Sequence, residues 1–250
     1  MVCTGVLQLI NYKKWTESLG YDREWLIQIT QSNFYKELVL HLKNLGGIAL
    51  QCRSDYYIVL EPQLSNLEKI NRKLINDLIS KSPVPLRLAL ICGEDPYLAQ
   101  HKATKILQEM KESIKIVNEG RLKEIGVIHV DVNNFTQLTM IDNVYNSYAE
   151  IINLIWKLAS QLKDLKVLVQ YLGGDNIALV FNPSKIDDLI KYFDKIENIK
   201  AGIGVSNVPR KAFELATKAL DTIRSKRNLK ILVLRENTPL HIYSISKFLR

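Results

Sequence analysis

Residues Tyr171 to Phe181 read YLGGDNIALVF, which places two glycines, an acid and an amide between two runs of strand-forming residues. Glycine tolerates the positive φ of a tight turn, and it also lets a ligand approach the backbone closely. The stretch therefore predicts a β-hairpin whose tip either only reverses the chain or also holds a ligand.

A related stretch occurs earlier in the chain. Ile48 to Leu60, IALQCRSDYYIVL, reads as two strands meeting at Arg53-Ser54-Asp55, and a shift of 120 positions places Asp55 on Asp175. Two more blocks recur in the same order, namely 6–12 with 127–133 and 86–107 with 199–220. Three ordered blocks at nearly constant offsets predict two copies of one unit. We predict domains over residues 1–118 and 119–250, with a polar junction within 113–126.

Each copy has the same predicted order of elements. A strand is followed by an amphipathic helix (23–44 or 141–162), the hairpin, a second helix (65–80 or 184–196), another strand, and a helix opened by Pro96 or Pro209. This β-α-β-β-α-β order is typical of ferredoxin-like or palm domains. We expect an α+β protein made of two tandem palm-like domains with antiparallel sheets, each covered by helices on one face.

Composition limits the class of protein. The chain is 47% hydrophobic and carries a net charge of +8, which favours an anionic partner or simply a soluble basic surface. It contains no apolar run near the ~20 residues that cross a bilayer. The three cysteines, Cys3, Cys52 and Cys92, are odd in number and lack ligand-like spacing, which argues against a disulfide framework and a zinc site. A cytoplasmic protein is expected.

Two carboxylates are expected to meet at the hairpin of copy two. In the predicted topology the first strand lies beside the hairpin, so Asp131 would come close to Asp175. Such oxygen ligands suit Mg²⁺, and two ions could bridge phosphate oxygens and activate water. The alternative is that Asp131 caps the turn at the end of its strand and that Asp175 is an ordinary turn residue. His129, on the same strand face, is interpreted as a core or supporting residue.

Copy one differs at the corresponding positions. Ile10 is aligned with Asp131, and Arg53-Ser54 replaces the glycine pair, so only Asp55 remains and this copy is expected to lack the metal site. Because copy one is expected to form the hairpin without glycines, folding alone would not require Gly173 and Gly174. We expect these glycines to make room for phosphate.

An ordered set of motifs resembles a known superfamily. The segments LINYKKW (9–15), RSDY (53–56), VDVNN (130–134), GGDN (173–176) and KAGIG (200–204) are similar to those of palm-type nucleotide cyclases and diguanylate (GGDEF) cyclases. Within that superfamily the chain resembles the archaeal GTP cyclohydrolase III family over nearly its whole length. The resemblance implies a Mg²⁺-dependent enzyme, with two ions and a monovalent cation as a further candidate. Its reaction opens the imidazole ring of GTP, retains the formyl group and releases two phosphates.

The resemblance also implies roles for individual residues. Asp131, the backbone carbonyl of Val132 and Asp175 would hold metal, and the two aspartates would be catalytic. Gly173 and Gly174 would admit the triphosphate. The remaining nucleotide-binding candidates are Asn133, Asn134 and Asn176 near the phosphates, Asn146 at the guanine edge and Arg224 on the phosphates. The expected partners are GTP and further copies of the chain, as a dimer or tetramer, without nucleic acid or membrane.

Two other functions fit part of the pattern. A nucleotidyl cyclase would form a phosphodiester, but a diguanylate cyclase is expected to carry GGDEF or GGEEF, whereas Asn176 follows Asp175 here. A non-enzymatic module could instead bind nucleotide or RNA through the basic surface. Substitution of Asp131 and Asp175 separates these alternatives, because a binding module would keep its affinity.

Overall fold

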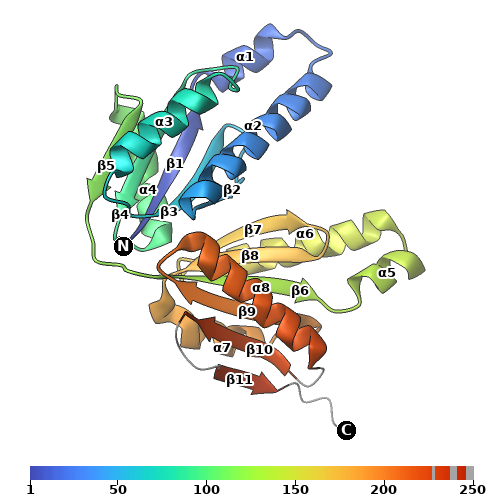
Figure 1. The fold of residues 1–250 in the computed structure, drawn as a ribbon. Helices are drawn as coiled ribbons and strands as arrows, with labels where there is room; N and C mark the ends of the chain where they lie inside the picture. The colour runs from blue at the N-terminus through green and yellow to red at the C-terminus, as the bar shows by residue number, and fades with distance from the viewer. Residues whose placement is uncertain (227–228, 237–240, 246–250) are drawn as a thin grey trace. The chain divides into compact units, whose positions relative to one another are not determined.

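The structure is a computed structural model that describes residues 1–226, 229–236 and 241–245, the last of these as backbone only. The chain forms two compact units, unit 1 (Met1–Lys123) and unit 2 (Glu124–Arg250), which are described separately. The division between them falls five residues after the position predicted from the sequence. Figure 1 shows both units as sheets flanked by helices.

Unit 1 contains a five-stranded sheet with the order β2-β3-β1-β4-β5. The central strand β1 pairs antiparallel with β3 and with β4, while β5 joins the edge parallel to β4. The elements are β1 (Val2–Leu9), α1 (Tyr12–Ser18), α2 (Glu24–Leu45), β2 (Ile48–Leu50), β3 (Tyr56–Pro62), α3 (Leu67–Ile79), β4 (Leu86–Cys92), α4 (Pro96–Glu109) and β5 (Ile114–Asn118).

Unit 2 repeats this arrangement with one more strand, in the order β11-β10-β9-β6-β8-β7. The central strand β6 pairs antiparallel with β8 and β9, and β10 lies parallel to β9. The elements are β6 (Ile125–Val132), α5 (Phe135–Ile141), α6 (Val144–Gln161), β7 (Leu168–Gly173), β8 (Asn176–Phe181), the 3₁₀ turn η1 (Pro183–Lys185), α7 (Ile186–Asp194), β9 (Ile199–Ser206), α8 (Pro209–Ser225), β10 (Leu229–Arg235) and β11 (His241–Ile245).

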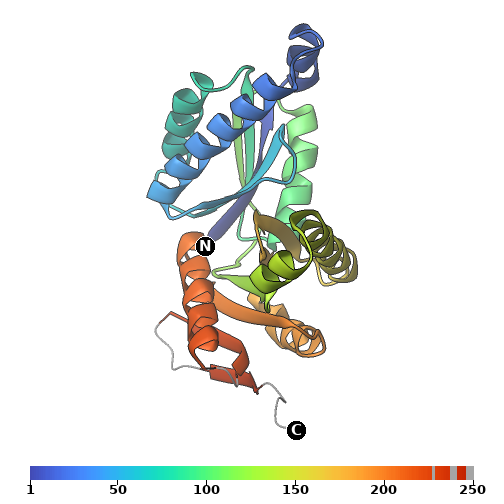
Figure 2. The same ribbon diagram turned by 90° about the vertical axis from the view of Figure 1, so that its right-hand side faces the viewer.

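The expected α+β fold with two palm-like units is confirmed, and Pro96 and Pro209 open helices as predicted. The expectation that helices cover one face of each sheet is wrong. In unit 1, α2 and α3 pack on one face while α4 packs on the other (Figure 2). Adjacent residues of a strand point to opposite sides, so the consecutive apolar residues Val6 and Leu7 contact the α4 side and the α2 side respectively. Both faces of the sheet are therefore apolar.

Two glycines of the KAGIG segment set the distance between α8 and the sheet of unit 2. A Cβ on Gly202 would lie 2.2 Å from the carbonyl oxygen of Ala216, and one on Gly204 would lie 2.0 Å from that of Ala212. Real Cβ atoms do not approach backbone oxygens so closely. Glycine at both positions therefore lets α8 pack directly on β9, which fixes the helix that carries Arg224 over the sheet.

Two predictions about unit 1 need correction. The segment 113–126, expected to be a polar junction, does contain the division after Lys123, but it also forms β5 and the start of β6. Cys3 and Cys92 form a disulfide, because the antiparallel pairing of β1 with β4 places them directly opposite each other. The argument against a disulfide considered only spacing along the chain, so it could not detect a pair 89 positions apart. Within the described residues, no helix has the length and apolar character needed to cross a membrane.

Candidate functional site

The hairpin between β7 and β8 is a tight turn over Gly174 and Asp175. Gly173 and Gly174 both have positive φ, 106° and 60°, and a Cβ on Gly173 would meet no atom within 4 Å. Glycine at the first central position with positive φ is what a type II′ turn requires. The backbone itself thus favours these glycines, and the space beside Gly173 is open.

The corresponding connection in unit 1 has a different shape. It runs over residues 51–55 between β2 and β3 and contains no residue with positive φ. The expectation that one hairpin geometry forms with and without glycines is therefore wrong, because unit 1 uses a longer connection. Asp55 there accepts two hydrogen bonds of 2.9 Å from the Arg53 guanidinium.

Asp131 lies near the end of β6, in the centre of the sheet. It pairs with Asn176, the first residue of β8, and with Lys200 on β9. The side chains of directly paired residues share one face of a sheet, and α8 packs against that face. Asp175 lies in the turn directly before Asn176, so it is one residue away from the strand residue that pairs with Asp131.

Arg224 contacts Asp131 from the last turn of α8. Its Nη2 donates to Asp131 Oδ1 at 2.5 Å, and its Nη1 donates to Asp221 Oδ1 at 3.2 Å. Asp131 is 8% exposed, so its carboxylate needs a positive partner. The hydrogen bond to Asp131 raises the pKa of Arg224, which keeps the guanidinium charged. The residue expected on phosphate thus neutralises the residue expected to bind metal.

His129 lies two residues before Asp131 on the same face of β6. Its Nε2 is 3.0 Å from Asn176 Oδ1, and its Nδ1 is 3.2 Å from Thr217 Oγ1 on α8. Burial lowers the pKa of His129, and this effect exceeds the opposing effect of the hydrogen bond with Asn176. Asn176 also donates from Nδ2 to Asp175 Oδ1 at 2.8 Å. Asn176 therefore has partners on both ends of its amide.

The residues at this position fit a divalent cation. Asp131 on β6 and Asp175 in the neighbouring β7–β8 turn supply carboxylate oxygens, and the carbonyl of Val132 follows Asp131 at the strand end. These are the hard-oxygen ligands that Mg²⁺ prefers. No group of three or more His, Cys, Asp or Glu side chains is gathered for a metal ion in the described part of the chain. A cation there would depend on two carboxylates, backbone oxygen, water and substrate oxygens.

A cleft of about 830 Å³ opens beyond the ends of β6 and β9, beside α5 and α6. Four residues predicted as site residues line it, namely Val132, Asn133, Asn134 and Asn146. Asn134 has φ 59°, a left-handed conformation that asparagine tolerates, and this conformation starts α5. Three acidic residues that were not predicted also line the cleft: Asp142, Glu150 and Glu197.

Asn146 is held in the first turn of α6. Its Nδ2 donates to both carboxylate oxygens of Asp142 at 2.9 Å, and its backbone N–H donates to the Asn143 side chain at 2.8 Å. Asn143 is thus the N-cap that starts the helix. The apolar wall of the cleft includes Phe135, Leu138, Ile141, Ile151, Leu154 and Ile199. An apolar cleft with amide and carboxylate groups at one rim suits a flat heterocycle with hydrogen-bonding edges.

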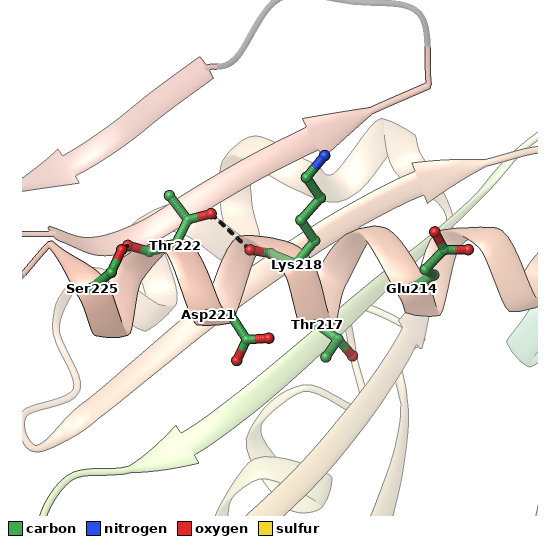
Figure 3. Close-up of a pocket in the computed structure, with 6 residues that line it drawn as sticks. All are labelled: Glu214, Thr217, Lys218, Asp221, Thr222 and Ser225. Atoms are coloured by element: carbon green, nitrogen blue, oxygen red, sulfur yellow. Dashed lines mark hydrogen bonds between the residues drawn. The ribbon is translucent and has the colours of Figure 1, made fainter.

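A second hollow follows the exposed side of α8. Figure 3 shows Thr217 and Asp221 on one side of this helix and Lys218 on the other. Thr217 reaches His129, and Asp221, whose side chain is 64% exposed, reaches Arg224, so this side of α8 supports the residues around Asp131.

Unit 1 lacks most of this site, but the sequence alignment of the two units needs correction. Gln8, rather than Ile10, occupies the position of Asp131, because Gln8 pairs with Tyr56 and Arg87 just as Asp131 pairs with Asn176 and Lys200. Gln8 Nε2 donates to the Tyr56 hydroxyl at 2.7 Å. Unit 1 therefore has an amide in place of the buried carboxylate.

The sequence identified His129 only as a core or supporting residue, and it gave no role to Thr217 or to the three acidic residues of the cleft. One signal for His129 was present, since residues two apart on a strand share a face with the key aspartate. Asp142, Glu150 and Glu197 lie on three separate segments, so only the folded chain brings them to one cleft.

The fold and site together define a palm-like α+β protein with one aspartate in a hairpin turn, Asp175, and another on the neighbouring strand, Asp131. The chain belongs to the GTP cyclohydrolase III family, because the sequence model of that family matches residues 2–237. A GTP cyclohydrolase III of Saccharolobus islandicus is 33% identical over 221 residues, covering 88% of this chain and 94% of the relative. One from Aeropyrum pernix is 30% identical over 235 residues, covering 94% and 97%.

Solved structures with similar architecture are more distant. The match to a bacterial light-regulated adenylyl cyclase covers 93% of this chain and 85% of the cyclase chain, with 11% identity and a TM-score of 0.35. A class III adenylyl cyclase-like ATP-binding protein from Pseudomonas aeruginosa covers 94% and 83% at 8% identity, with a TM-score of 0.36.

Proposed function

We propose that the protein is a Mg²⁺-dependent GTP cyclohydrolase that opens the imidazole ring of guanine and releases two phosphates. The observation that carries this proposal is the family match over residues 2–237. It is supported by the position of Asp131 on β6 beside the β7–β8 turn that carries Asp175.

The proposed reaction balances with water alone. One water adds to the ring carbon between the two imidazole nitrogens, and cleavage of one C–N bond leaves the formyl group on the other nitrogen. Two further waters each cleave one phosphoanhydride bond. The products are a formylamino-pyrimidine ribosyl monophosphate and two phosphates.

Two divalent cations are proposed, and they would be held by Asp131, Asp175 and the Val132 carbonyl. When bound, such ions supply polarisation of phosphate oxygens and lower the pKa of a coordinated water. The open space beside Gly173 would accept the triphosphate. Arg224 would exchange its contact with Asp131 for phosphate oxygens, since its guanidinium is partly exposed and reaches the same carboxylate.

The cleft beside α5 and α6 would take the guanine. Guanine presents N–H donors on one edge, and the carboxylates of Asp142 and Glu150 are acceptors that suit this edge. Asn146 would then fix Asp142 in place through its two hydrogen bonds. Asn133 lies where the cleft meets the strand end, between the base and the carboxylates.

The test is incubation with GTP and Mg²⁺ while the purine absorbance and released phosphate are followed. Wild type should lose the purine spectrum, while Asp131→Asn and Asp175→Asn should lose most turnover. Asp164→Asn, an exposed acid of the same unit, should behave as wild type. An unchanged spectrum at stoichiometric enzyme contradicts the proposal. A cyclic or dinucleotide product would indicate a nucleotidyl cyclase, and tight GTP binding without any product would indicate a binding module.

We also propose that the two units are copies of one ancestral unit. They share the order of their first nine helices and strands, apart from the 3₁₀ turn η1, and the five strands of unit 1 have the same sheet order as β7, β8, β6, β9 and β10 of unit 2. Unit 1 would serve as a structural partner, because Gln8 and the Arg53–Asp55 pair leave it without two free carboxylates.

A homo-oligomer formed through α6 is proposed as well. Tyr145, Tyr148 and Trp156 are 75%, 50% and 69% exposed and follow one another at helical spacing, with Ile152 between them. At roughly 150–250 Å² for a whole aromatic side chain, the exposed parts of these three offer about 300–500 Å². The exposed Met140 and Ile141 of α5 extend the patch toward the ~800 Å² per partner of a stable interface. A second copy of the chain would cover it.

Light scattering after size exclusion tests the oligomer. Trp156→Glu should reduce the particle mass, because a charge would be buried in the interface. Trp25→Glu is the matched control, since Trp25 is also exposed, at 56%, but lies in unit 1. Equal masses for Trp156→Glu and wild type would contradict the proposal.

A further inference from the structure

A chain of three hydrogen bonds connects α8 with the tip of the hairpin. It runs from Thr217 to His129, from His129 to Asn176 and from Asn176 to Asp175, with distances of 3.2, 3.0 and 2.8 Å. The chain therefore joins three separate elements, α8, β6 and the β7–β8 turn. It ends on the carboxylate that the proposed function assigns to metal.

The Asp175 carboxylate determines which group donates and which accepts in each of these hydrogen bonds. A carboxylate only accepts hydrogen bonds, so the Asn176 amide turns its Nδ2 to Asp175 and its Oδ1 to His129. Asn176 Oδ1 can only accept, so His129 donates from Nε2. The Nδ1 atom of the neutral ring then accepts from the Thr217 hydroxyl. Each group has one partner of the required kind.

Packing holds the imidazole in this orientation. His129 pairs with Ala178 on one side and with Gly202 on the other, and these small residues leave room for a ring above the sheet. The Phe213 ring of α8 covers it, with 5.6 Å between the ring centroids. The two ring nitrogens are therefore directed to the hairpin and to the helix.

The way Asp175 is held differs from that of its counterpart in unit 1. Asp55 is bound by the charged Arg53, whereas Asp175 is held by a neutral amide and forms no ion pair within the described part of the chain. Val6 occupies the position of His129 in unit 1, because Val6 pairs with Ala89 and Ile58 in the way that His129 pairs with Gly202 and Ala178. The hydrogen bonds from Thr217 through His129 and Asn176 therefore occur in unit 2, where the aspartate of the turn has no ion-pair partner among the described residues.

We propose that His129 is a positioning residue that, through Asn176, orients the Asp175 carboxylate toward a divalent cation. This inference rests on the proposed function, which assigns Asp175 to metal. The neutral Asn176 amide orients the Asp175 carboxylate, and it does not neutralise the negative charge that would attract a cation. Groups that orient metal ligands in this way typically change metal affinity about 10–100-fold when removed.

The test measures Mn²⁺ binding by paramagnetic resonance, in the presence of GTP, with the full chain. His129→Leu removes the donor, and we expect Mn²⁺ affinity to fall by about tenfold. His129→Gln keeps an N–H donor and should bind Mn²⁺ within about threefold of wild type. Thr217→Val removes only the far end of the chain and should have the smallest effect.

A double-mutant cycle separates positioning from a general loss of structure. Asn176→Ala should weaken Mn²⁺ binding as His129→Leu does, and the double variant should lose no more than either single variant. Additive losses, or an unchanged affinity in His129→Leu, would overturn the inference. If His129→Leu does not fold, the comparison of His129→Gln with Asn176→Ala decides: equal losses in both would also overturn it.

The proposed metal site can fail independently. If Asp131→Asn and Asp175→Asn both bind Mn²⁺ as wild type does, the assignment of metal to these aspartates is wrong, and the inference falls with it. If those two variants lose Mn²⁺ while His129→Leu keeps it, only the positioning role is wrong.

Discussion

Glu61 should make the stability of unit 1 depend on pH, and replacing it with glutamine should remove that dependence. Glu61 lies on β3 and is 1% exposed. Its Oε1 accepts a hydrogen bond of 2.7 Å from Asn71 Nδ2 on α3, while its Oε2 is buried without a partner. Burial raises the pKa of this carboxyl from 4.5 to about 7, and the hydrogen bond from Asn71 only partly opposes the effect.

The size and sign follow from the two pKa values. The folded chain binds the Glu61 proton more tightly than the unfolded chain, so the folded state is favoured most at low pH. The free energy of unfolding should then fall as the pH rises from 4.5 to about 7 and stay level above that. At about 1.4 kcal/mol for each pKa unit, the total change is about 3 kcal/mol.

The assay compares Glu61→Gln with wild type. Glutamine stays neutral at every pH, so the difference in free energy of unfolding between the two chains should grow by about 3 kcal/mol between about pH 4 and about pH 8. Hydrogen exchange followed by mass spectrometry measures β3 and α3 separately from unit 2, which serves as the internal reference.

Glu68 provides the matched control for this experiment. It lies on α3 with a side chain 64% exposed, paired with Arg72, so Glu68→Gln should change little with pH. A difference between Glu61→Gln and wild type that stays flat over this pH range would refute the argument from burial.

Three further predictions concern packing, the disulfide and the cleft. Gly204→Ala should destabilise unit 2 by about 1–3 kcal/mol, because the new Cβ would lie 2.0 Å from the Ala212 oxygen; thermal melting measures this, and Lys218→Ala on the exposed side of α8 should leave the melting temperature unchanged. Cys92→Ser opens the link between Cys3 and Cys92 and should lower the stability of unit 1 by up to about 4 kcal/mol; a reductant should destabilise wild type but not the variant, and equal behaviour of both would contradict the link. Asp142→Ala should weaken GTP binding by roughly 10–100-fold, the value of a hydrogen bond to a charged group; calorimetry with GTP measures it, and equal weakening of ATP binding would argue against a guanine-specific contact.

Local patterns in the sequence were sufficient for most elements and their order, but they did not predict α1, β5, α5 or β11. Alternation of apolar residues marked the strands, and prolines marked the starts of α4 and α8. The repeat then indicated two similar units, and the hairpin motif indicated where acidic residues would gather. These signals act within a few residues of each other, so a single sequence contains them.

The same local patterns could not predict how strands distant in the sequence pair with one another. The sequence aligned Ile10 with Asp131, whereas the strand register aligns Gln8. The two choices differ by two residues, and a shift of two keeps every side chain on the same face of the sheet. The apolar pattern is therefore equally satisfied by both, and only the hydrogen-bonded pairing distinguishes them.

The sequence by itself thus determined the α+β class, the order of the main helices and strands, and the glycine-aspartate hairpin as the centre of the candidate site. The tertiary structure alone decided that Cys3 meets Cys92, that Arg224 covers Asp131, and that His129 reaches Asn176. Each of these contacts joins residues at least 47 positions apart. Contacts of that kind depend on register and on how closely a helix approaches a sheet, and neither is recorded in the local periodicity of a chain.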